Sequence, residues 1–309
     1  MIVPARDAAG TIAATLEAIA GQRFDGSYEV IVVDNGSVDE TAAIAQRLGV
    51  TVLRRRRGEG PAAARNAGAE AAAAPALAFT DGDCQPAPGW LQTGLHALQA
   101  ADLVQGPVQP PPGVAAGPFD RTVWVRDEGL YETANLFVRR EWWELAGGFC
   151  ELLPSDGVSA PFGEDAWFGW RARRRGARTA YAADALVHHA VFPRRASAYV
   201  AERRRLERFP ALVAQVPELR TQRLYARWFL NQRTAALDVA LLGGLAGLAT
   251  RRAAPAALAV APYAALVLRA SARWGARLGP RVAGASVAAD LVGAAALVKG
   301  SWKWRTVVL

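Results

Sequence analysis

Cysteine and histidine are scarce in this chain of 309 residues, which has two of the first and three of the second. Cys84 and Cys150 are too few for a disulfide framework and lack the spacing of a zinc site. We therefore expect two free thiols in a reducing compartment. The chain begins with MIVPARD, which we expect to form a first strand rather than a secretory signal.

Negative charge is in deficit, because the formal net charge is +8 and the isoelectric point is about 10.1. A basic balance favours phosphate-bearing partners, namely nucleic acid, nucleotides or anionic lipid. Nucleic acid is the least favoured of these, since the arginine runs at 54–57, 171–175 and 203–205 have no regularly spaced stacking aromatics among them.

Short apolar runs alternate with helical periodicity in the first half of the chain. We expect strands at 2–3, 28–33, 50–53, 76–80 and 103–108, and helices at 11–22, 39–48, 61–74 and 89–100, with Asp39 as an N-cap. This alternation predicts βαβ units in a parallel sheet with helices on both faces. Ligands bind such sheets beyond the carboxyl ends of the strands, where Asp34 and Asp81 fall.

A Pro/Gly-rich loop at 109–120 precedes a less regular half. Here we expect a strand at 131–138, a helix at 141–146, a flexible loop at 152–163, a helix at 164–176, a strand at 185–192 and helices from about 200. The predicted organisation is a domain at 1–215, made of halves 1–108 and 109–215, followed by a hydrophobic helical region at 216–309.

Three apolar segments, at 234–250, 253–268 and 282–298, are bounded by basic residues. They are at or just under the roughly 17–25 residues that span a bilayer. One interpretation is a soluble bundle or dimer interface. The other, which we favour, is association with a membrane, with arginines at the headgroups.

Two carboxylates, Asp81 and Asp83, follow the apolar run at 76–80. A simple turn explains them locally, because Asp and Gly favour turns. The functional alternative is a divalent metal held by few protein oxygens, as Mg²⁺ usually is. Gly82 between them would let the backbone approach a ligand closely.

The pattern at Gly58-x-Gly60-x-x-Ala63 is similar to a dinucleotide-binding fingerprint. Four arginines separate it from the preceding strand, and Pro61 removes an N–H from the turn that would cradle a pyrophosphate. We therefore disfavour a dehydrogenase and expect Pro61 in the first turn of a helix.

Further acidic and imidazole groups lie in the second half. Glu164 and Asp165 begin a helix, where capping alone explains them, but a carboxylate there would also serve as a general base. His188 and His189 are neighbours on a strand and face opposite sides, so at most one serves a given site. Packing in the core is the alternative for either.

Five segments together resemble family 2 glycosyltransferases. They are VVDNGSVDET at 32–41, RNAG at 65–68, DGD at 81–83, TANLFVRR and GGF within 133–149, and EDAWFGWR at 164–171. The resemblance covers residues 1–195 and implies the GT-A fold, an α/β architecture with a Rossmann-like mixed sheet flanked by helices. This fold has a nucleotide-sugar-binding half, here at 1–108, and an acceptor-binding half, here at 109–215. The apolar C-terminal region varies in this family.

The resemblance also implies roles for individual residues. Pro4, Ala5, Arg6 and Asp34 would bind the base and ribose. Asp81 would lie near the ribose and the metal, with Gly82 beside it in the nucleotide-sugar site, and Arg65 would lie near the diphosphate or the metal. Asp83, with at most one of His188 and His189, would hold Mg²⁺ or Mn²⁺. Asp165, with Glu164 beside it, would be the catalytic base, and Asn135, Gly148 and Phe149 would lie on the acceptor side.

The implied reaction is an inverting transfer of sugar from a UDP-, GDP- or dTDP-sugar to a hydroxyl acceptor at the cytoplasmic side of the membrane. A lipid-linked molecule and a soluble one are both candidates for the acceptor. The Q-x-x-R-W element of processive synthases is absent, since QRLYARW at 222–228 has different spacing, so we expect transfer of one sugar. A sugar-phosphate nucleotidyltransferase is the nearest alternative, but Pro4-Ala5-Arg6 replaces its Gly-rich loop. A catalytically silent scaffold is the other alternative, and intact Asp83 and Asp165 argue against it.

Overall fold

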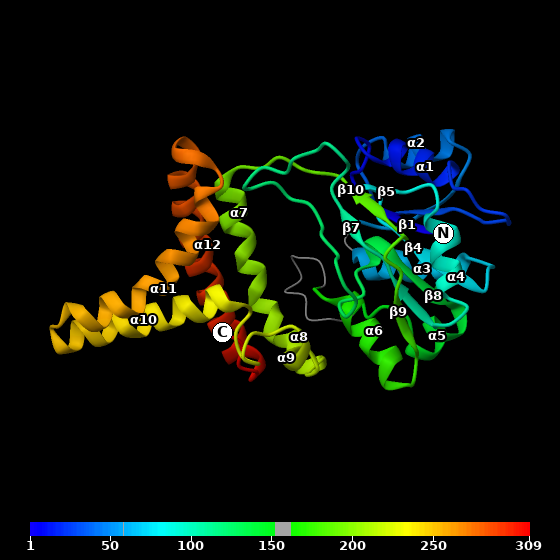
Figure 1. Cartoon of the computed structure of the whole chain (residues 1–309). Coiled ribbons are helices and arrows are strands. Elements are labelled where there is room, and N and C mark those ends of the chain that lie inside the picture. The colour runs from blue at the N-terminus through cyan, green and yellow to red at the C-terminus, as the bar shows by residue number, and fades with distance from the viewer. Residues whose placement is uncertain (58, 152–161) are drawn as a thin grey trace. The chain divides into compact units, whose positions relative to one another are not determined.

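The computed structural model describes residues 1–57, 59–151 and 162–309 (Figure 1). Gly58 of the glycine pattern and most of the loop predicted at 152–163 therefore lie outside the described residues. The chain divides into two compact units. Unit 1 comprises Met1–Ala116 and Thr122–Phe192, and unit 2 comprises Gly117–Arg121 and Pro193–Leu309.

The main sheet of unit 1 is mixed. Among the described residues its strand order is β3 (Thr51–Arg54), β2 (Ile31–Asp34), β1 (Ile2–Ala5), β4 (Ala76–Phe79), β8 (Leu136–Arg139), β6 (Leu103–Gln105) and β9 (Thr179–Tyr181). The first four strands are parallel, as predicted. β8 inserts antiparallel between β4 and β6, so the sheet as a whole is mixed. This mixed α/β sheet confirms the predicted fold class.

A second, smaller sheet consists of β5 (Cys84–Pro86), β10 (Val187–His189) and β7 (Val108–Gln109). β10 is antiparallel to β5, and its register places His189 opposite Cys84. The residue that follows the second acid of the DGD segment is thus paired with a histidine from a hundred residues later in the chain.

The helices of unit 1 flank the main sheet. They are α1 (Ile12–Ala20), α2 (Thr41–Arg47), α3 (Gly60–Ala71), α4 (Trp90–Ala97), α5 (Arg140–Ala146) and α6 (Glu164–Arg174), with a 3-10 turn η1 (Thr133–Asn135). Pro61 lies in the first turn of α3, as predicted. The predicted N-cap is wrong, because Glu40 rather than Asp39 precedes α2. The Asp39 carboxylate instead accepts hydrogen bonds from the N–H groups of Thr41 and Ala9.

The strand predicted at 131–138 begins only at Leu136. Tyr131 has a left-handed backbone (φ 55°), and η1 follows it. Its buried ring packs on Gly169 of α6, where a Cβ atom would meet the ring at 2.0 Å. The predicted strand is therefore too long at its start, where Tyr131 packs against α6 instead of joining the sheet.

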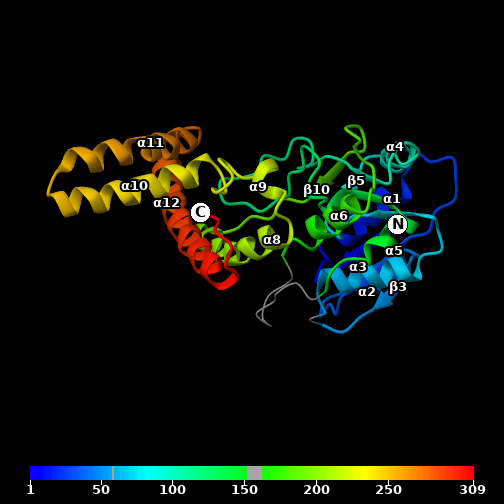
Figure 2. The same ribbon diagram turned by 90° about the horizontal axis from the view of Figure 1, so that it is seen from below.

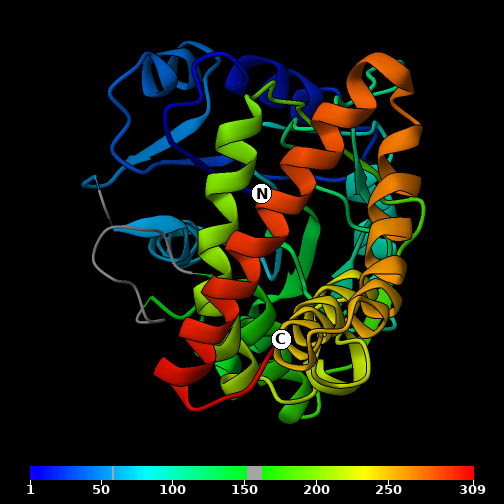
Figure 3. The same ribbon diagram turned by 90° about the vertical axis from the view of Figure 1, so that its left-hand side faces the viewer.

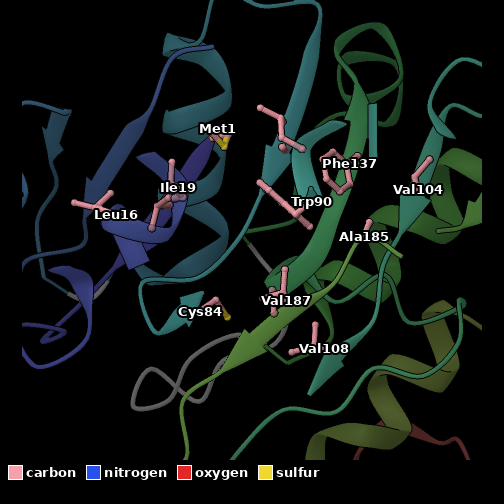
Figure 4. Close-up of a cluster of buried hydrophobic side chains, with 14 of the residues drawn as sticks. Met1, Leu16, Ile19, Cys84, Trp90, Val104, Val108, Phe137, Ala185 and Val187 are labelled. Carbon is pink, nitrogen blue, oxygen red and sulfur yellow. The ribbon is translucent and has the colours of Figure 1, made fainter. Parts of the chain in front are cut away.

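Apolar side chains from the strands, α1 and α4 form one core (Figure 4). Leu16 and Ile19 come from α1, and Trp90 of α4 contacts Phe137 of β8 with ring centroids 4.7 Å apart. On α3 the approach to the sheet is close, since a Cβ at Gly68 would lie 2.5 Å from Ile2 Cγ2. This contact fixes the helix that carries Arg65 and Asn66.

Unit 2 is helical, as predicted (Figures 2 and 3). Its elements are α7 (Ala196–Glu202), η2 (Arg203–Arg208), α8 (Phe209–Gln215), α9 (Leu219–Gln222), α10 (Gln232–Thr250), α11 (Ala253–Ala272) and α12 (Gly275–Trp304). The last three are long and apolar enough to cross a membrane by length and composition. They contain the three predicted apolar segments and support a membrane-associated region.

The boundary between the compact units lies at Phe192/Pro193, whereas the sequence motifs predict a functional boundary at 215/216. Residues 193–215 thus pack with the C-terminal helices. The division of residues 1–215 into a nucleotide-sugar-binding and an acceptor-binding half stays a prediction.

Candidate active site

The carboxyl ends of β1, β2 and β4 meet at one edge of the main sheet. Ala5 is in register with Asp34, and the N–H of Gly82 donates to the carbonyl of Pro4 at 3.2 Å. The buried Asp34 accepts from the N–H of Ser37 at 3.1 Å. A Cβ at Gly82 would lie 3.1 Å from Ala5 Cβ, so glycine permits the close approach of the two loops.

The DNGSVDET segment holds the loop that follows β1. Ser37 Oγ accepts from the N–H of Asp7 at 2.9 Å, and Thr41 Oγ1 accepts from the N–H of Ala8 at 2.7 Å. Asp7, which has a left-handed backbone (φ 49°), accepts in turn from the N–H of Val38 at 2.9 Å. These three hydrogen bonds, which we call the latch, follow the exposed Arg6. Asp7 was not among the predicted site residues, and its acceptor role depends on a fold that the local sequence does not reveal.

Arg65 connects three of the predicted motifs. This side chain of α3 is 8% exposed, donating from Nη1 to Glu164 Oε1 at 3.0 Å and from Nη2 to Asp81 Oδ1 at 3.1 Å. Burial lowers the pKa of Arg65, but Asp81, Glu164 and Asp165 outweigh that effect and raise it. Arg65 therefore stays a cation between the DGD loop and the first turn of α6.

Asp165 lies beside this ion-paired group. Its Oδ1 accepts from the N–H of Ala166 at 2.8 Å. Burial and the negative charges of Glu164 and Glu132 raise the pKa of Asp165 well above its ordinary value, while Arg65 opposes the rise. A carboxyl group with such a raised pKa is a stronger base than an ordinary surface aspartate.

Asn66, the neighbour of Arg65, clamps the GGF segment. Its Nδ2 donates to the carbonyl of Phe149, and its Oδ1 accepts from the N–H of the same residue, both at 2.8 Å. The clamp needs a close approach at Gly148 (φ 62°), where a Cβ would lie 2.8 Å from Asn66 Oδ1. Asn66 was missed as a site residue, although the RNAG motif contains it.

Asp83 and His189 form a candidate metal site. His189 Nε2 lies 3.5 Å from Asp83 Oδ1, and Cys84 Sγ is close to both. His189 Nδ1 is 2.6 Å from the carbonyl of Ala190, and a proton on Nδ1 there leaves the Nε2 lone pair facing the carboxylate. Two acceptors that face each other in this way suit a cation between them. Burial raises the pKa of the Cys84 thiol well above its ordinary value, and the charges of Asp81 and Asp83 raise it further.

The structure separates the two predicted histidines. His188 points away from Asp83, with Nδ1 3.3 Å from the carbonyl of Pro110, whereas His189 is buried beside Asp83. The prediction that the two face opposite sides is confirmed, and His189 is the one near the DGD loop.

The predicted acceptor-side residues have structural contacts. Asn135 is fully buried, donates from Nδ2 to the carbonyls of Pro107 and Ala185, and accepts from Trp90 Nε1. Phe149 is buried against Phe79 and Phe168, with ring centroids 5.2 and 4.6 Å away. These contacts hold both side chains within unit 1, and their place on the acceptor side stays a prediction.

Comparisons with known proteins agree with the motif pattern. Residues 1–140 match the sequence profile described as glycosyl transferase family 2. Glycosyltransferase AglE of Haloferax volcanii is 36% identical over 174 residues, which cover 51% of this chain and 57% of the relative. The pre-mycofactocin glycosyltransferase of Mycobacterium tuberculosis is 30% identical over 209 residues, which cover 61% of this chain and 42% of the relative. The chain thus spans about half the length of these curated relatives.

The fold has a counterpart among solved structures. The mannosyltransferase PcManGT from Pyrobaculum calidifontis, solved in complex with GDP-Man and Mn²⁺, superposes with a TM-score of 0.58 at 21% identity. The match covers 98% of this chain and 86% of that protein. At this identity the likeness shows a shared fold, and it matches the predicted GT-A architecture.

Proposed function

We propose that this chain, whose residues 1–140 match the profile of glycosyl transferase family 2, is a member of that family. We propose further that it transfers one sugar from a nucleotide-sugar donor to a hydroxyl acceptor, with inversion at the anomeric carbon. The observation that carries this proposal is the double ion pair of Arg65. The Arg65 guanidinium donates hydrogen bonds both to Asp81, on the proposed donor side, and to Glu164, which is next to the proposed base. The ion pairs thus hold the donor side and the base close together.

Asp165 is the proposed general base. It would take the proton from the acceptor hydroxyl as the oxygen attacks the anomeric carbon from the face opposite the nucleoside diphosphate. One base and one in-line displacement give inversion. Glu164, whose carboxylate is committed to Arg65, is better suited to positioning α6 than to accepting that proton.

The donor would bind at the carboxyl ends of β1, β2 and β4. Asp34, with the backbone of Pro4, Ala5 and Arg6, would contact the base and ribose, and Asp81 and Gly82 would lie beside the ribose. Arg65, committed to two carboxylates, would act on the diphosphate through the position of Asp81 rather than as a direct ligand. The latch of Ser37 and Thr41 on the loop after β1 would preform this pocket.

Asp83 and His189 would hold a divalent cation, Mg²⁺ or Mn²⁺. The lone pair of His189 Nε2 and the Asp83 carboxylate fit such an ion chemically. When bound, the ion would neutralise negative charge on the nucleoside diphosphate as it leaves. The Mn²⁺ and GDP-Man of the structural neighbour support the classes of cofactor and donor, and leave the sugar and nucleotide of this chain open.

A panel of donors tests the proposal. With Mn²⁺ present, we expect at least one UDP-, GDP- or dTDP-sugar to bind the purified protein in isothermal titration calorimetry and to yield free nucleoside diphosphate when a membrane lipid extract supplies acceptors. Asp83→Ala should lose metal-dependent donor binding. Absence of binding across the panel would favour a silent scaffold, and release of pyrophosphate from a nucleoside triphosphate and a sugar phosphate would favour a nucleotidyltransferase.

A further inference from the structure

Cys84 is a core residue whose sulfur lies beside a proposed metal ligand. It follows Asp83 directly, begins β5, and has a fully buried side chain. The same core contains Val187 of β10 (Figure 4), so apolar packing is one explanation of the cysteine. Its Sγ atom also lies 3.8 Å from Asp83 Oδ1. This contact gives the thiol a second possible role, in binding the cation.

The pairing of β5 with β10 puts Cys84 and His189 on one face of the small sheet. The two residues are opposite each other in the antiparallel register. Side chains directly opposite project from the same face, with Cβ atoms about 4.5–5.5 Å apart. The donor atoms of Asp83, Cys84 and His189 all lie within 4.8 Å of one another. An oxygen, a sulfur and an imidazole nitrogen therefore surround one small volume.

Main-chain hydrogen bonds hold these three residues in place. The N–H of Ala190 donates to the carbonyl of Asp83 at 2.9 Å. The N–H of Cys84 donates to the carbonyl of Asp81 at 3.0 Å. His189 Nδ1 faces the carbonyl of Ala190, which leaves Nε2 on the side of Asp83. Because the fold fixes the donor atoms before an ion arrives, little ordering remains to oppose binding.

The distances between the donor atoms match a single ion among them. Bonds to zinc are about 2.0–2.2 Å from oxygen and nitrogen and about 2.3 Å from sulfur, and in a tetrahedral arrangement they put oxygen about 3.4 Å from nitrogen and about 3.6 Å from sulfur. The observed separations are 3.5 Å from Asp83 Oδ1 to His189 Nε2 and 3.8 Å from Asp83 Oδ1 to Cys84 Sγ. Octahedral Mg²⁺ brings neighbouring oxygen ligands closer, to about 3.0 Å.

Solvent reaches this group of donor atoms from the side of Asp83. Side-chain exposure is 24% for Asp83 and 3% for His189, and Cys84 is fully buried. An ion held by all three would have its remaining coordination positions on the Asp83 side, where the proposed diphosphate would enter. Three protein ligands with one open side are typical of zinc sites that exchange a ligand.

We propose that Cys84 is a third protein ligand of the divalent cation, through its sulfur, and that it makes the site select thiophilic ions over Mg²⁺. The thiol proton leaves to solvent as the sulfur–metal bond forms. Thiolate suits Zn²⁺ and related transition ions, whereas Mg²⁺ prefers oxygen ligands. The inference rests on the proposed function and narrows its cofactor: Zn²⁺ and Co²⁺ should bind more tightly than Mn²⁺, and Mg²⁺ most weakly.

Cobalt absorption tests the assignment, because a thiolate bound to Co²⁺ gives a sulfur-to-cobalt charge-transfer band in the near ultraviolet that oxygen and nitrogen ligands do not give. The chain has two cysteines, so in Cys150→Ser any such band belongs to Cys84. We would titrate Co²⁺ into the full chain in detergent, first alone and then with UDP or GDP. We expect the band at one equivalent in the unsubstituted protein and in Cys150→Ser, and its loss in Cys84→Ser and Cys84→Ala.

Competition between metals gives a second readout. Zn²⁺ and Mg²⁺ affinities follow from displacement of Co²⁺. Cys84→Ser should weaken Zn²⁺ binding at least about tenfold and leave the weaker Mg²⁺ binding unchanged. Equal losses for both ions would assign Cys84 to packing and overturn the inference. The absorption of Cys150→Ser requires no change at position 84, so the test stands even where the Cys84 variants do not fold.

Two further results would overturn the inference and leave the proposed function in place. One is Co²⁺ binding that Asp83→Ala abolishes but that gives no charge-transfer band in Cys150→Ser, since the cation would then have oxygen and nitrogen ligands alone. The other is a band that persists in Cys84→Ser, which would assign the sulfur ligand to Cys150. Absence of Co²⁺ binding with and without nucleotide would also overturn the inference, and the donor panel then tests the proposed function separately.

Discussion

Removal of the Arg65 cation should affect both stability and catalysis. In Arg65→Gln, the carboxylates of Asp81 and Glu164 lose the guanidinium that lies 3.1 and 3.0 Å from them, at a site where the cation is 8% exposed. Breaking a buried ion pair by removing one partner costs about 3–5 kcal/mol, because the remaining charge stays desolvated. We therefore expect the free energy of unfolding of unit 1 to fall by about that amount.

A matched control is Arg55→Gln, which removes an arginine whose pair with Glu59 is about one third exposed. Such surface pairs contribute about 0–1 kcal/mol. Guanidinium titrations of both variants, followed by tryptophan fluorescence, compare the two losses. A loss for Arg65→Gln no larger than that for Arg55→Gln would refute the view that Arg65 holds the DGD loop and α6 together.

The same substitution has a catalytic signature that lost stability alone would not produce. Because Arg65 lowers the pKa of Asp165 against burial, Glu164 and Glu132, its removal should raise that pKa further. A general base must be deprotonated, so activity is lost as the pH falls through its pKa in the folded enzyme. The acidic limb of the rate profile should consequently move to higher pH in Arg65→Gln, and an unmoved limb would contradict the coupling.

Three further predictions concern neighbouring groups. In the unsubstituted enzyme, kcat/KM should rise as the pH passes through the raised pKa of Asp165. Glu132→Gln removes a negative charge and should shift that rise to lower pH. An unchanged pH profile would show that Glu132 does not affect the pKa of Asp165. His189→Ala should weaken Mn²⁺ binding at least about tenfold in calorimetry, whereas His188→Ala, beside Pro110, should leave it unchanged, and equal effects would argue against the site. Asn66→Ala should lower the free energy of unfolding by about 1–3 kcal/mol for each main-chain group of Phe149 left without its partner, and wild-type stability in a denaturant titration would contradict the clamp.

Local sequence patterns predicted the parts of the fold that depend on neighbours in the chain. The apolar runs that became β1 to β4 are parallel, and all of them except the edge strand β3 are largely buried. The carboxyl ends of β2 and β4 place Asp34 and Asp81 at the same edge of the sheet. The apolar segments likewise became α10 to α12. α12 begins at Gly275 rather than at 282, because a helix continues through charged residues that hydropathy excludes.

Long-range pairing explains most of what the sequence did not predict. β5 has three residues and exists because β10 pairs with it across a hundred positions. The left-handed Tyr131 depends on Gly169, and the clamp of Asn66 depends on Phe149. The RNAG motif predicted that Arg65 belongs to the site, near the diphosphate or the metal. The sequence did not predict its ion pairs with Asp81 and Glu164, because these depend on how α3, the DGD loop and α6 pack together.

The central claim is that Asp165 is the base in a transfer from a nucleotide sugar, and Asp165→Asn tests it most directly. The amide is nearly isosteric and cannot take a proton from a hydroxyl. With the donor identified from the panel, we predict that Asp165→Asn binds it in calorimetry as tightly as the unsubstituted protein does and releases nucleoside diphosphate at least about a hundredfold more slowly. Transfer by Asp165→Asn at the unsubstituted rate would contradict the account.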